Sequence, residues 1–242
     1  MKPTICSIII LIFSGTVSVA QKINTLSPAE KKAGWKLLFD GKTTNGWRGA
    51  YSSGFPKHGW KVADGILSGD LSDGAESGDA GDIVTLKKYR DFELVFDWKL
   101  GKGGNSGVKY FIEERQPKPE KGSQAGYEYQ LIDDAEYIYQ DKKLPQDLKT
   151  ASIYDVVAPE KTDTKMEVWH SSKIVVRKNH IEHWLDGVKV LDTDRSSQAF
   201  KNGVADSKFR DYPGFGDITE GHILLQDHGH SVGFRNIKIK EL

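Results

Sequence analysis

The sequence predicts an all-β protein, built as a sandwich or jelly roll of short antiparallel strands. Apolar and charged residues alternate from Phe92 to Leu100, which is the period of a strand with one buried face. Asp-Gly pairs at 64–65 and 186–187 separate short alternating runs, the signal of a two-residue hairpin turn. No long segment has the apolar period of a helix. Together these features favour stacked sheets over an α/β fold.

The first 20 residues have the features of a secretory signal peptide. Lys2 supplies a positive charge, an apolar run extends from Ile5 to Phe13, and Ser18-Val19-Ala20 places small residues at the cleavage site. The run is shorter than the ~20 residues that a membrane-spanning helix needs. We therefore expect cleavage before Gln21 and a periplasmic or secreted protein without a membrane span.

Cysteine content and charge exclude several kinds of chemistry. Cys6 is the only cysteine, so the mature chain would have neither disulfides nor thiolate chemistry. It lies at the start of the apolar run, whereas a lipid-anchored cysteine would lie at its end. A metal site would therefore use His, Asp, Glu or carbonyl oxygen. Acidic and basic residues balance at 34 each, without a basic block, which argues against nucleic-acid binding.

The expected elements follow in chain order. Ser27, Pro28 and Glu30 form an N-cap, a first-turn proline and a capping-box acid, so residues 21–33 are expected to be an extension with a short helix. Residues 34–242 are expected to form one domain, with a second short helix near Ser196–Lys201. Strands are expected at Trp60–Val62, Ile66–Leu67, Phe92–Leu100, Ile174–Val176, His180–Leu185, Val188–Leu191, His222–Gln226 and Val232–Ile239.

Two segments carry candidate sugar-binding residues. The run Gly103–Phe111 is rich in glycine, which lets a ligand approach the backbone, and Lys109 lies on the strand that follows. In Gly126–Asp134, strand alternation places Glu128 and Gln130 on one face, where they could bond to sugar hydroxyls. The alternatives are a solvated lysine after an ordinary hairpin and a surface carboxylate.

Histidines in two strands are candidates for acid–base or metal chemistry. His183 shares a strand face with Ile181 and Leu185, where a hydrogen-bonded core histidine is the alternative to a catalytic one. The segment His222–His230 holds three histidines and Asp227, but it lacks the HExxH spacing and a second ligand cluster. The 6 Trp and 9 Tyr could stack on sugars, although aromatic residues also fill sandwich cores.

Ten motifs occur in order along the chain: Gly34-Trp35 to Phe39-Asp40-Gly41-Lys42, Gly46-Trp47, Gly81–Thr85, Asp91–Leu94, Asn105–Tyr110, Tyr127–Gln130, His183–Gly187, Ser207–Phe209, Gly221–Gly229 and Phe234–Ile237. Together they resemble the 3-keto-disaccharide hydrolase domain family. That family, formerly a domain of unknown function, is also described as a 3-keto-glucoside 1,2-lyase/3-keto-2-hydroxyglucal hydratase. The resemblance covers about residues 34 to 242. Asp186 stands where asparagine is common in the family, a change that preserves the turn.

The resemblance implies a concanavalin A-like jelly roll, of the lectin and glucanase type, whose concave sheet holds the sugar. It also implies a functional link to a sugar 3-dehydrogenase, which first oxidises the substrate at C3. A C3 ketone makes the C2 proton acidic and the C1 aglycone a leaving group. Cleavage then needs a base, an enolate stabiliser and an acid. Addition of water to the resulting double bond would complete a net hydrolysis.

For this chemistry, Glu128 and His183 are expected to act as base and acid, in an order that the sequence leaves open. Lys109, or a bound divalent metal, would stabilise the enolate. Asp227 and His228 are the candidate metal ligands. The expected substrate-binding residues are Asn105, Tyr110, Gln130, Trp184 and Gln226.

Two other functions remain open at this stage. A non-catalytic, lectin-like carbohydrate-binding module would need the aromatic residues but no acid–base pair, because a fold does not determine its function. A conventional laminarinase-type glycosidase would need a closely spaced acidic pattern such as E-x-D-x-x-E, which the sequence lacks.

Overall fold

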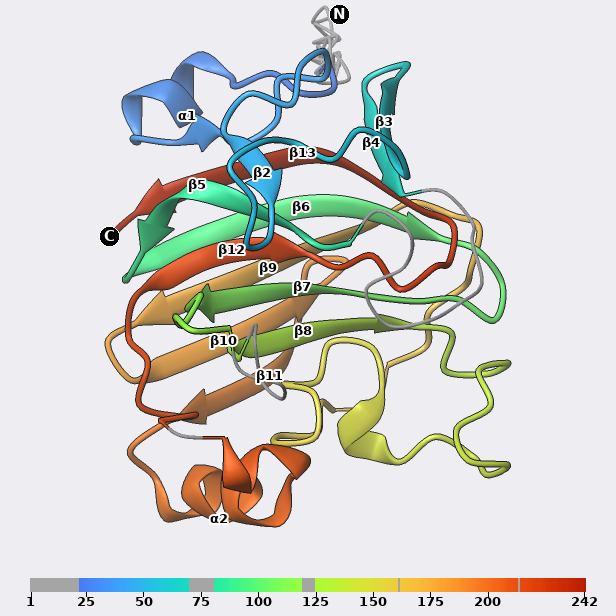
Figure 1. The fold of residues 1–242 in the computed structure, drawn as a ribbon, viewed down its shortest axis with the longest axis vertical. Coiled ribbons are helices and arrows are strands. Elements are labelled where there is room, and N and C mark those ends of the chain that lie inside the picture. The colour runs from blue at the N-terminus through green and yellow to red at the C-terminus, as the bar shows by residue number, and fades with distance from the viewer. Residues whose placement is uncertain (1–21, 70–80, 119–124, 161, 213) are drawn as a thin grey trace, which may run out of the picture.

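The computed structural model describes residues 22–69, 81–118, 125–160, 162–212 and 214–242. Within these residues the chain forms two antiparallel sheets that pack face to face (Figure 1). The larger sheet contains β1 (Lys36–Leu37), β3 (Trp60–Ala63), β4 (Ile66–Gly69), β6 (Phe92–Leu100), β9 (His170–Arg177), β10 (His180–Leu185), β11 (Val188–Asp194) and β13 (Val232–Glu241). The smaller sheet contains β2 (Trp47–Gly49), β5 (Ile83–Tyr89), β7 (Asn105–Ile112), β8 (Tyr127–Ile132) and β12 (Gly221–Leu225).

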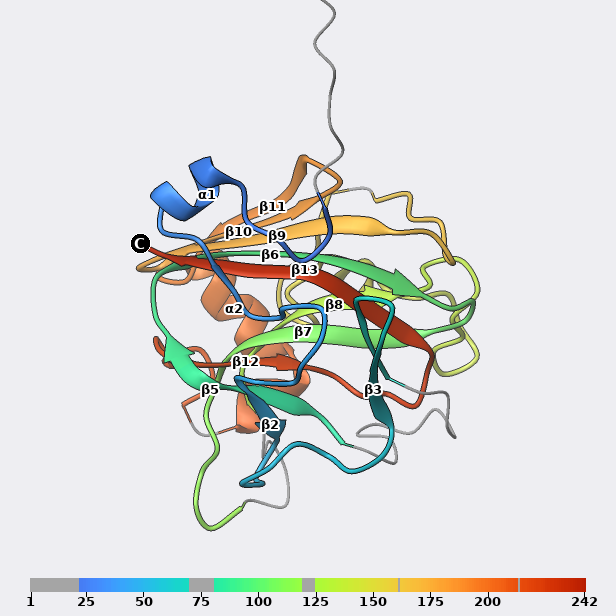
Figure 2. The same ribbon diagram turned by 90° about the horizontal axis from the view of Figure 1, so that it is seen from above.

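Strand order differs from chain order in both sheets, because the chain crosses repeatedly from one sheet to the other, as it does in a jelly roll. The larger sheet runs β11-β10-β9-β6-β13-β4-β3, with β1 also paired to β13, and the smaller sheet runs β2-β5-β12-β7-β8. In the view from above, β6, β9 and β13 lie in one layer and β5, β7 and β12 in the other (Figure 2). The predicted all-β jelly-roll sandwich is therefore confirmed.

Short-range signals explain the hairpins. The β3–β4 turn has positive φ at Asp64 (52°) and Gly65 (76°), and the β10–β11 turn has positive φ at Asp186 (47°) and Gly187 (80°). A type I′ turn requires positive φ at both central residues, which Asp-Gly tolerates. Both predicted hairpins are confirmed, and β6 occupies the predicted residues Phe92–Leu100.

The helices also follow their capping signals. In α1 (Pro28–Lys32), the Ser27 hydroxyl accepts from the Glu30 amide at 3.2 Å, and the Glu30 carboxylate accepts from the Ser27 amide at 2.7 Å. The second helix, α2 (Gln198–Asp206), begins after Ser197 and runs five residues beyond the expected end. Short 3₁₀ turns occur at η1 (Gln146–Leu148) and η2 (Lys208–Asp211).

The core lies between the two sheets and is rich in aromatic rings. Phe96 of β6 meets Tyr129 of β8 with ring centroids 5.5 Å apart, and Phe92 meets Tyr110 of β7 at 6.1 Å. Every residue of β7 and β8 is buried. Because successive residues of a strand point to opposite faces, these two strands are covered on both faces, and not only on the side of the core.

The expected signal peptide, residues 1–20, lies outside the described residues. In the part of the chain that the structure describes, no helix is both long enough and apolar enough to cross a membrane.

Candidate active site

The face of the smaller sheet that points away from the core carries a group of buried polar side chains. We call Asn105, Lys109, Glu128, Gln130 and Gln226 the polar cluster. Counted as whole residues, all five are at most 9% exposed. The residues that alternate with them, such as Tyr110 and Tyr129, belong to the core between the sheets. The prediction that Glu128 and Gln130 share a face away from the core tyrosines is confirmed.

Lys109 and Glu128 form an ion pair within this cluster. They are directly opposite each other in the β7–β8 register, and the Lys109 Nζ lies 3.6 Å from the Glu128 Oε2. Their side chains are only 11% and 8% exposed. Burying either charge alone would cost several kcal/mol, so each charge makes the burial of the other tolerable. The two residues that the sequence suggested separately are therefore one unit.

Gly107 provides the room in which the Glu128 side chain lies. A Cβ atom at Gly107 would be 2.3 Å from the Glu128 Oε1 and 2.9 Å from its carboxyl carbon. The φ angle of Gly107 is outside the left-handed region, so glycine is needed here for space and not for backbone conformation. The Glu128 carboxylate thus extends across β7, towards β12. The Gly107 carbonyl accepts a hydrogen bond of 2.9 Å from the backbone amide of Gln226, which directly follows β12.

Two amide side chains of the cluster offer unsatisfied acceptors. Within the described residues, Asn105 Oδ1 and Gln226 Oε1 are buried and accept no hydrogen bond. Buried polar atoms are nearly always hydrogen-bonded, so each exception calls for an explanation. A ligand with hydroxyl donors would satisfy both. Gln130 differs, because its Oε1 already accepts from the Leu131 amide at 3.0 Å.

Asp82 is a further acidic residue near the ion pair, and sequence reasoning included it only within a motif. It directly precedes β5 and is 3% exposed, and its Oδ1 accepts from the Asp227 amide at 2.8 Å. Burial raises the pKa of Asp82 to about 6; the positive charge of Lys109 opposes this rise, and the Glu128 and Asp227 carboxylates add to it. The only sequence signal was a carboxylate at the start of an apolar strand.

The candidate metal ligands Asp227 and His228 lie beside the cluster but act as turn residues. The Asp227 carboxylate accepts from the Gly229 amide at 3.0 Å and from the Gly81 amide at 3.1 Å. The His228 Nε2 lies 3.2 Å from the Asn105 Nδ2. Neither residue belongs to a group of three potential ligands within the described part of the chain. Asp227 thus binds the backbone amides of neighbouring turns, and metal binding by Asp227 and His228 stays a prediction.

A group of three potential ligands does occur on the larger sheet, on the other side of the sandwich. It consists of His180, Glu182 and Asp192. The Lys189 Nζ lies 3.5 Å from the Glu182 carboxylate and also bonds to Asp192. The Lys189 ammonium group therefore already supplies the positive charge that a metal ion would bring to these carboxylates.

The structure places His183 in the core, away from the polar cluster. It is fully buried; its Nδ1 donates to the Ala151 carbonyl at 2.9 Å, and its Nε2 lies 3.0 Å from the Tyr110 hydroxyl. Burial lowers the pKa of His183 to about 4, against a smaller raising effect of the hydrogen bond to Ala151. Its ring packs on Tyr129, which points to the opposite face of β8 from Glu128. The expected Glu128–His183 acid–base pair is therefore corrected: the sheet separates the two side chains.

Two expected substrate-binding residues also lie elsewhere. Tyr110 is fully buried in the core, where it contacts His183. Trp184 lies on the outer face of the larger sheet, with the Lys173 Nζ 3.8 Å from its ring centroid and its Nε1 donating to Glu182 at 2.8 Å. Neither side chain is on the face that carries the polar cluster. Alternation correctly divided the residues of β7 and β10 between the two faces of each strand. It did not show which of the two faces meets the core.

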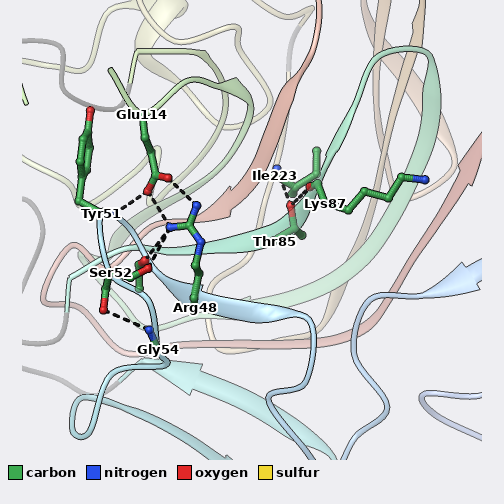
Figure 3. Close-up of polar contacts among 9 residues, drawn as sticks. Arg48, Tyr51, Ser52, Gly54, Thr85, Lys87, Glu114 and Ile223 are labelled. Atoms are coloured by element: carbon green, nitrogen blue, oxygen red, sulfur yellow. Dashed lines mark hydrogen bonds and ion pairs between the residues drawn. The ribbon is translucent and has the colours of Figure 1, made fainter. Parts of the chain in front are cut away.

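A second, partly exposed ion pair lies at the other end of the same sheet face. The Arg48 guanidinium binds both oxygens of the Glu114 carboxylate, at 2.9 and 2.5 Å (Figure 3). Glu114 also accepts from the Tyr51 amide at 2.5 Å, and Arg48 donates to the Ser52 carbonyl at 3.3 Å. The pair thus ties the loop after β2 to the end of β7. In the same view, the Thr85 hydroxyl joins β5 to β12.

The family model of the 3-keto-alpha-glucoside-1,2-lyase-like domain matches residues 34–240. The chain belongs to this family. The match confirms the resemblance drawn from the motifs and covers nearly all of the sandwich. A 3-keto-disaccharide hydrolase of Bacteroides thetaiotaomicron is 33% identical over 245 aligned positions, which cover 92% of this chain and 83% of that protein.

Two solved structures from Parabacteroides distasonis, both proposed to be glycosyl hydrolases, are also similar. The first has a TM-score of 0.81 and 35% identity, and the match covers 91% of this chain and all of that one. The second has a TM-score of 0.66 and 26% identity, and covers 86% of this chain and 99% of that one. The family fold therefore extends over almost the whole described chain.

Proposed function

We propose that this protein is an enzyme that cleaves 3-keto-glycosides by removing the C2 proton and eliminating the aglycone from C1. The observation that carries the proposal is the buried Lys109–Glu128 pair. It shares a sheet face with the side-chain oxygens of Asn105 and Gln226, which accept no hydrogen bond within the described residues. The relatives support a hydrolase that acts on carbohydrate. The oxidised substrate and the elimination step are our inference from the chemistry of these side chains.

Glu128 is assigned as the base. Its carboxylate lies on a face where the neighbouring side chains are polar, and Gly107 leaves the space above β7 open to it. A carboxylate beside a bound ketone can take the C2 proton, because the C3 carbonyl receives the electron pair as an enolate. Protonated Glu128 is then suited to return that proton to the aglycone oxygen as the C1–O bond breaks. Atoms and charge balance without a second acid.

Lys109 is assigned as the group that stabilises the enolate. Before the reaction its ammonium compensates the negative charge on Glu128, 3.6 Å away. As the proton moves to Glu128, the negative charge moves to the C3 oxygen. A cation within reach of both positions stabilises the charge throughout, with little rearrangement, which is the principle of a preorganised site.

Asn105 and Gln226 are assigned to substrate binding. Their buried oxygens would accept hydrogen bonds from hydroxyl groups of the sugar and so orient the ring over the ion pair. Water added across the C1–C2 double bond of the eliminated product would give net hydrolysis. Gln130 is assigned to support of β8, since its side-chain oxygen already binds the Leu131 amide.

The test compares an oxidised glycoside with its ordinary counterpart. The purified protein is incubated with a nitrophenyl 3-keto-glucoside and with the matching glucoside, and the released nitrophenol is measured. We expect release from the oxidised compound alone, with a primary isotope effect when C2 carries deuterium. Equal inertness of both compounds, or equal cleavage of both, would contradict the proposal. Saturable binding of the oxidised compound without release would instead favour a carbohydrate-binding module.

Three further expectations stay predictions. A divalent metal could supply the stabilisation assigned to Lys109, and dialysis against EDTA followed by metal addition tests this directly. We propose that the protein acts outside the cytoplasm, which the signal-peptide features of residues 1–20 support. We also propose that a sugar 3-dehydrogenase provides its substrate, because a glycoside must be oxidised at C3 before this chemistry can occur.

A further inference from the structure

One row of side chains crosses all five strands of the smaller sheet. From β2 to β8 its members are Arg48, Val84, Leu224, Lys109 and Glu128, and each is directly opposite the next in the strand register. Residues that are directly opposite in neighbouring antiparallel strands point to the same face of the sheet. Arg48 therefore shares a face with the Lys109–Glu128 pair, although it lies on the other edge of the sheet.

The Arg48–Glu114 ion pair crosses this face beside the row. Arg48 belongs to β2 and Glu114 follows the end of β7, so the pair spans the two strands that lie between them, β5 and β12. The Tyr51 amide also donates to Glu114, which fixes the loop after β2 at this end of the face (Figure 3). Ala50 belongs to the same loop. We call Arg48, Ala50 and Glu114 the end wall.

The end wall adjoins apolar side chains that are themselves fully buried. They are Val84, Ile112 and Leu224, each 0% exposed, and Ala50 packs on them. Val84 and Leu224 are members of the row, and Leu224 is directly opposite Lys109. The sheet face is therefore closed on the side of Lys109 that leads to the end wall.

The opposite end of the face, at Asn105, is less covered. The Asn105 Nδ2 donates to the Tyr137 hydroxyl at 3.3 Å, and the Tyr137 ring lies 6.3 Å from that of His230. Both Tyr137 and His230 are half-buried, whereas the apolar residues beside the end wall are not exposed at all. A group that extends beyond the site therefore has its way out at the Asn105 end.

The roles assigned to the ion pair determine which atoms of the sugar face the end wall. The Glu128 carboxylate, assigned to the C2 proton and the C1 oxygen, lies over Gly107. Lys109, assigned to the C3 oxygen, is two residues nearer to Glu114 along β7. The ring order C1, C2, C3 therefore runs towards the end wall, and C4 with its hydroxyl comes next.

We propose that the end wall restricts the enzyme to oxidised rings without a substituent at O4, so that it acts at the free end of a 1,4-linked glycan and not inside the chain. This inference rests on the proposed function and adds to it the position of the oxidised ring. A sugar attached at O4 would have to occupy the space of the end wall, and such a clash excludes a ligand without weakening the binding of others. The end wall sets no limit on the leaving group, which departs at the other end.

The test compares two substrates of the wild-type protein, a nitrophenyl 3-keto-glucoside and the same compound with a glucose attached at O4 of the oxidised ring. Both release nitrophenol, so a difference between them reports the O4 substituent alone. We expect kcat/KM to be at least about 100-fold lower for the substituted compound, because a group that has no room in a site is rejected at about this level or more strongly.

Two double variants test whether the end wall causes the difference. Arg48→Ala with Glu114→Ala shortens both side chains of the ion pair, so we expect the preference for the unsubstituted compound to fall at least about tenfold. Arg48→Met with Glu114→Gln is the matched control, since it removes the charges but keeps side chains of similar length, and it should retain the preference. Arg48→Ala alone replaces the first variant if that protein does not fold.

The outcomes separate the end wall from the reaction. Similar kcat/KM values of the wild type for both compounds would overturn the end wall and leave the proposed function intact. A preference that is unchanged in a folded Arg48→Ala variant would overturn it as well. If the wild type releases nitrophenol from neither compound, the proposed function fails, and calorimetry with both compounds decides the end wall. Binding of the unsubstituted compound alone would support it, and any other result would overturn it.

Discussion

Lys109 and Glu128 face each other across two neighbouring strands, with 3.6 Å between the ammonium nitrogen and a carboxylate oxygen, on a sheet face where both are buried. A surface pair of this kind would contribute little and would be screened by salt. Buried, the two charges depend on each other, and a bound ketone between them would meet a base and a cation at once. The site therefore follows from the burial of both faces of β7 and β8.

Glu128→Gln should abolish most of the activity with little change in structure. The substitution keeps the shape of the side chain and removes its ability to take a proton. We expect kcat on a nitrophenyl 3-keto-glucoside to fall by about 10²–10⁴, the usual contribution of a general base. Glu113→Gln is the control, because Glu113 is near the end of β7 with a side chain 46% exposed. Wild-type turnover by a folded Glu128→Gln protein would remove Glu128 from the mechanism.

Gly107→Ala should displace the Glu128 carboxylate. The added methyl group would lie 2.3 Å from Oε1, closer than any real contact, so the carboxylate must move. A shift of about 1 Å at a reacting group can cost about 10² in rate, and we expect a loss of kcat of that order.

Gly101→Ala provides the comparison for this substitution. Its methyl group would meet only the Ser231 carbonyl oxygen at 3.6 Å and the Ser231 Cβ at 3.8 Å, which are ordinary contacts. Steady-state kinetics of the two variants, with melting temperatures, separates displacement of Glu128 from general instability. Equal kcat values for both variants would show that the position of the carboxylate over β7 does not matter.

Glu114→Gln should destabilise the protein more than a surface substitution does. Glu114 binds Arg48 through both oxygens, with side-chain exposures of 13% and 16%, so the substitution leaves a largely buried guanidinium without its counter-charge. Breaking a buried pair costs about 3–5 kcal/mol, and we expect the low end of that range because the pair is partly exposed.

The double variant Arg48→Met with Glu114→Gln tests the cause. It removes the charge that Glu114→Gln leaves behind, so we expect it to recover part of the lost free energy of unfolding in urea. If Arg48→Met lowers the free energy of unfolding by the same amount in the wild type and in Glu114→Gln, the two residues do not act as a pair.

His183 should make the protein less stable as the pH falls below neutrality. Its pKa in the folded protein is about 4, below the ordinary 6.5, because burial disfavours the charged ring. Between these values the unfolded chain binds a proton that the folded chain does not. The stabilisation is therefore complete above about pH 6.5 and is lost as the pH falls to about 4, by at most about 3 kcal/mol.

The measurement is the free energy of unfolding in urea, at about pH 7 and about pH 4.5, for the wild type and His183→Gln. The variant should be less stable at neutral pH but should lose less stability on acidification. The comparison isolates His183 from Asp82, whose pKa is shifted upward and whose effect on stability has the opposite sign. Parallel losses in the two proteins would show that His183 titrates normally.

The strands, the hairpin turns and the first helix could be predicted because they depend on neighbours in sequence. Alternation along β6, the Asp-Gly turn at 186–187 and the capping box of Ser27 and Glu30 are all short-range, and the structure confirms each. The shared face of Glu128 and Gln130 follows from the same period of two. These features needed no knowledge of which strands pair.

The site as a whole depended on pairings between distant segments. Asp82 and Asp227 are joined by a hydrogen bond across 145 residues. The ring of Tyr137, from the loop after β8, lies next to that of His230, from the loop after β12. The sequence marked Asp227 and His230 only as members of a histidine-rich segment, and no local pattern showed which distant residues they would meet.

By itself, the sequence determined that this chain is a β sandwich of one family, and that Lys109 and Glu128 lie on strands. Only the tertiary structure decided that these two residues lie together with Asn105 on a buried face outside the core, whereas His183 and Tyr110 fill the core. The physical reason is that alternation defines two faces of a strand without saying which one is covered by the partner sheet. That choice is made by packing between sheets.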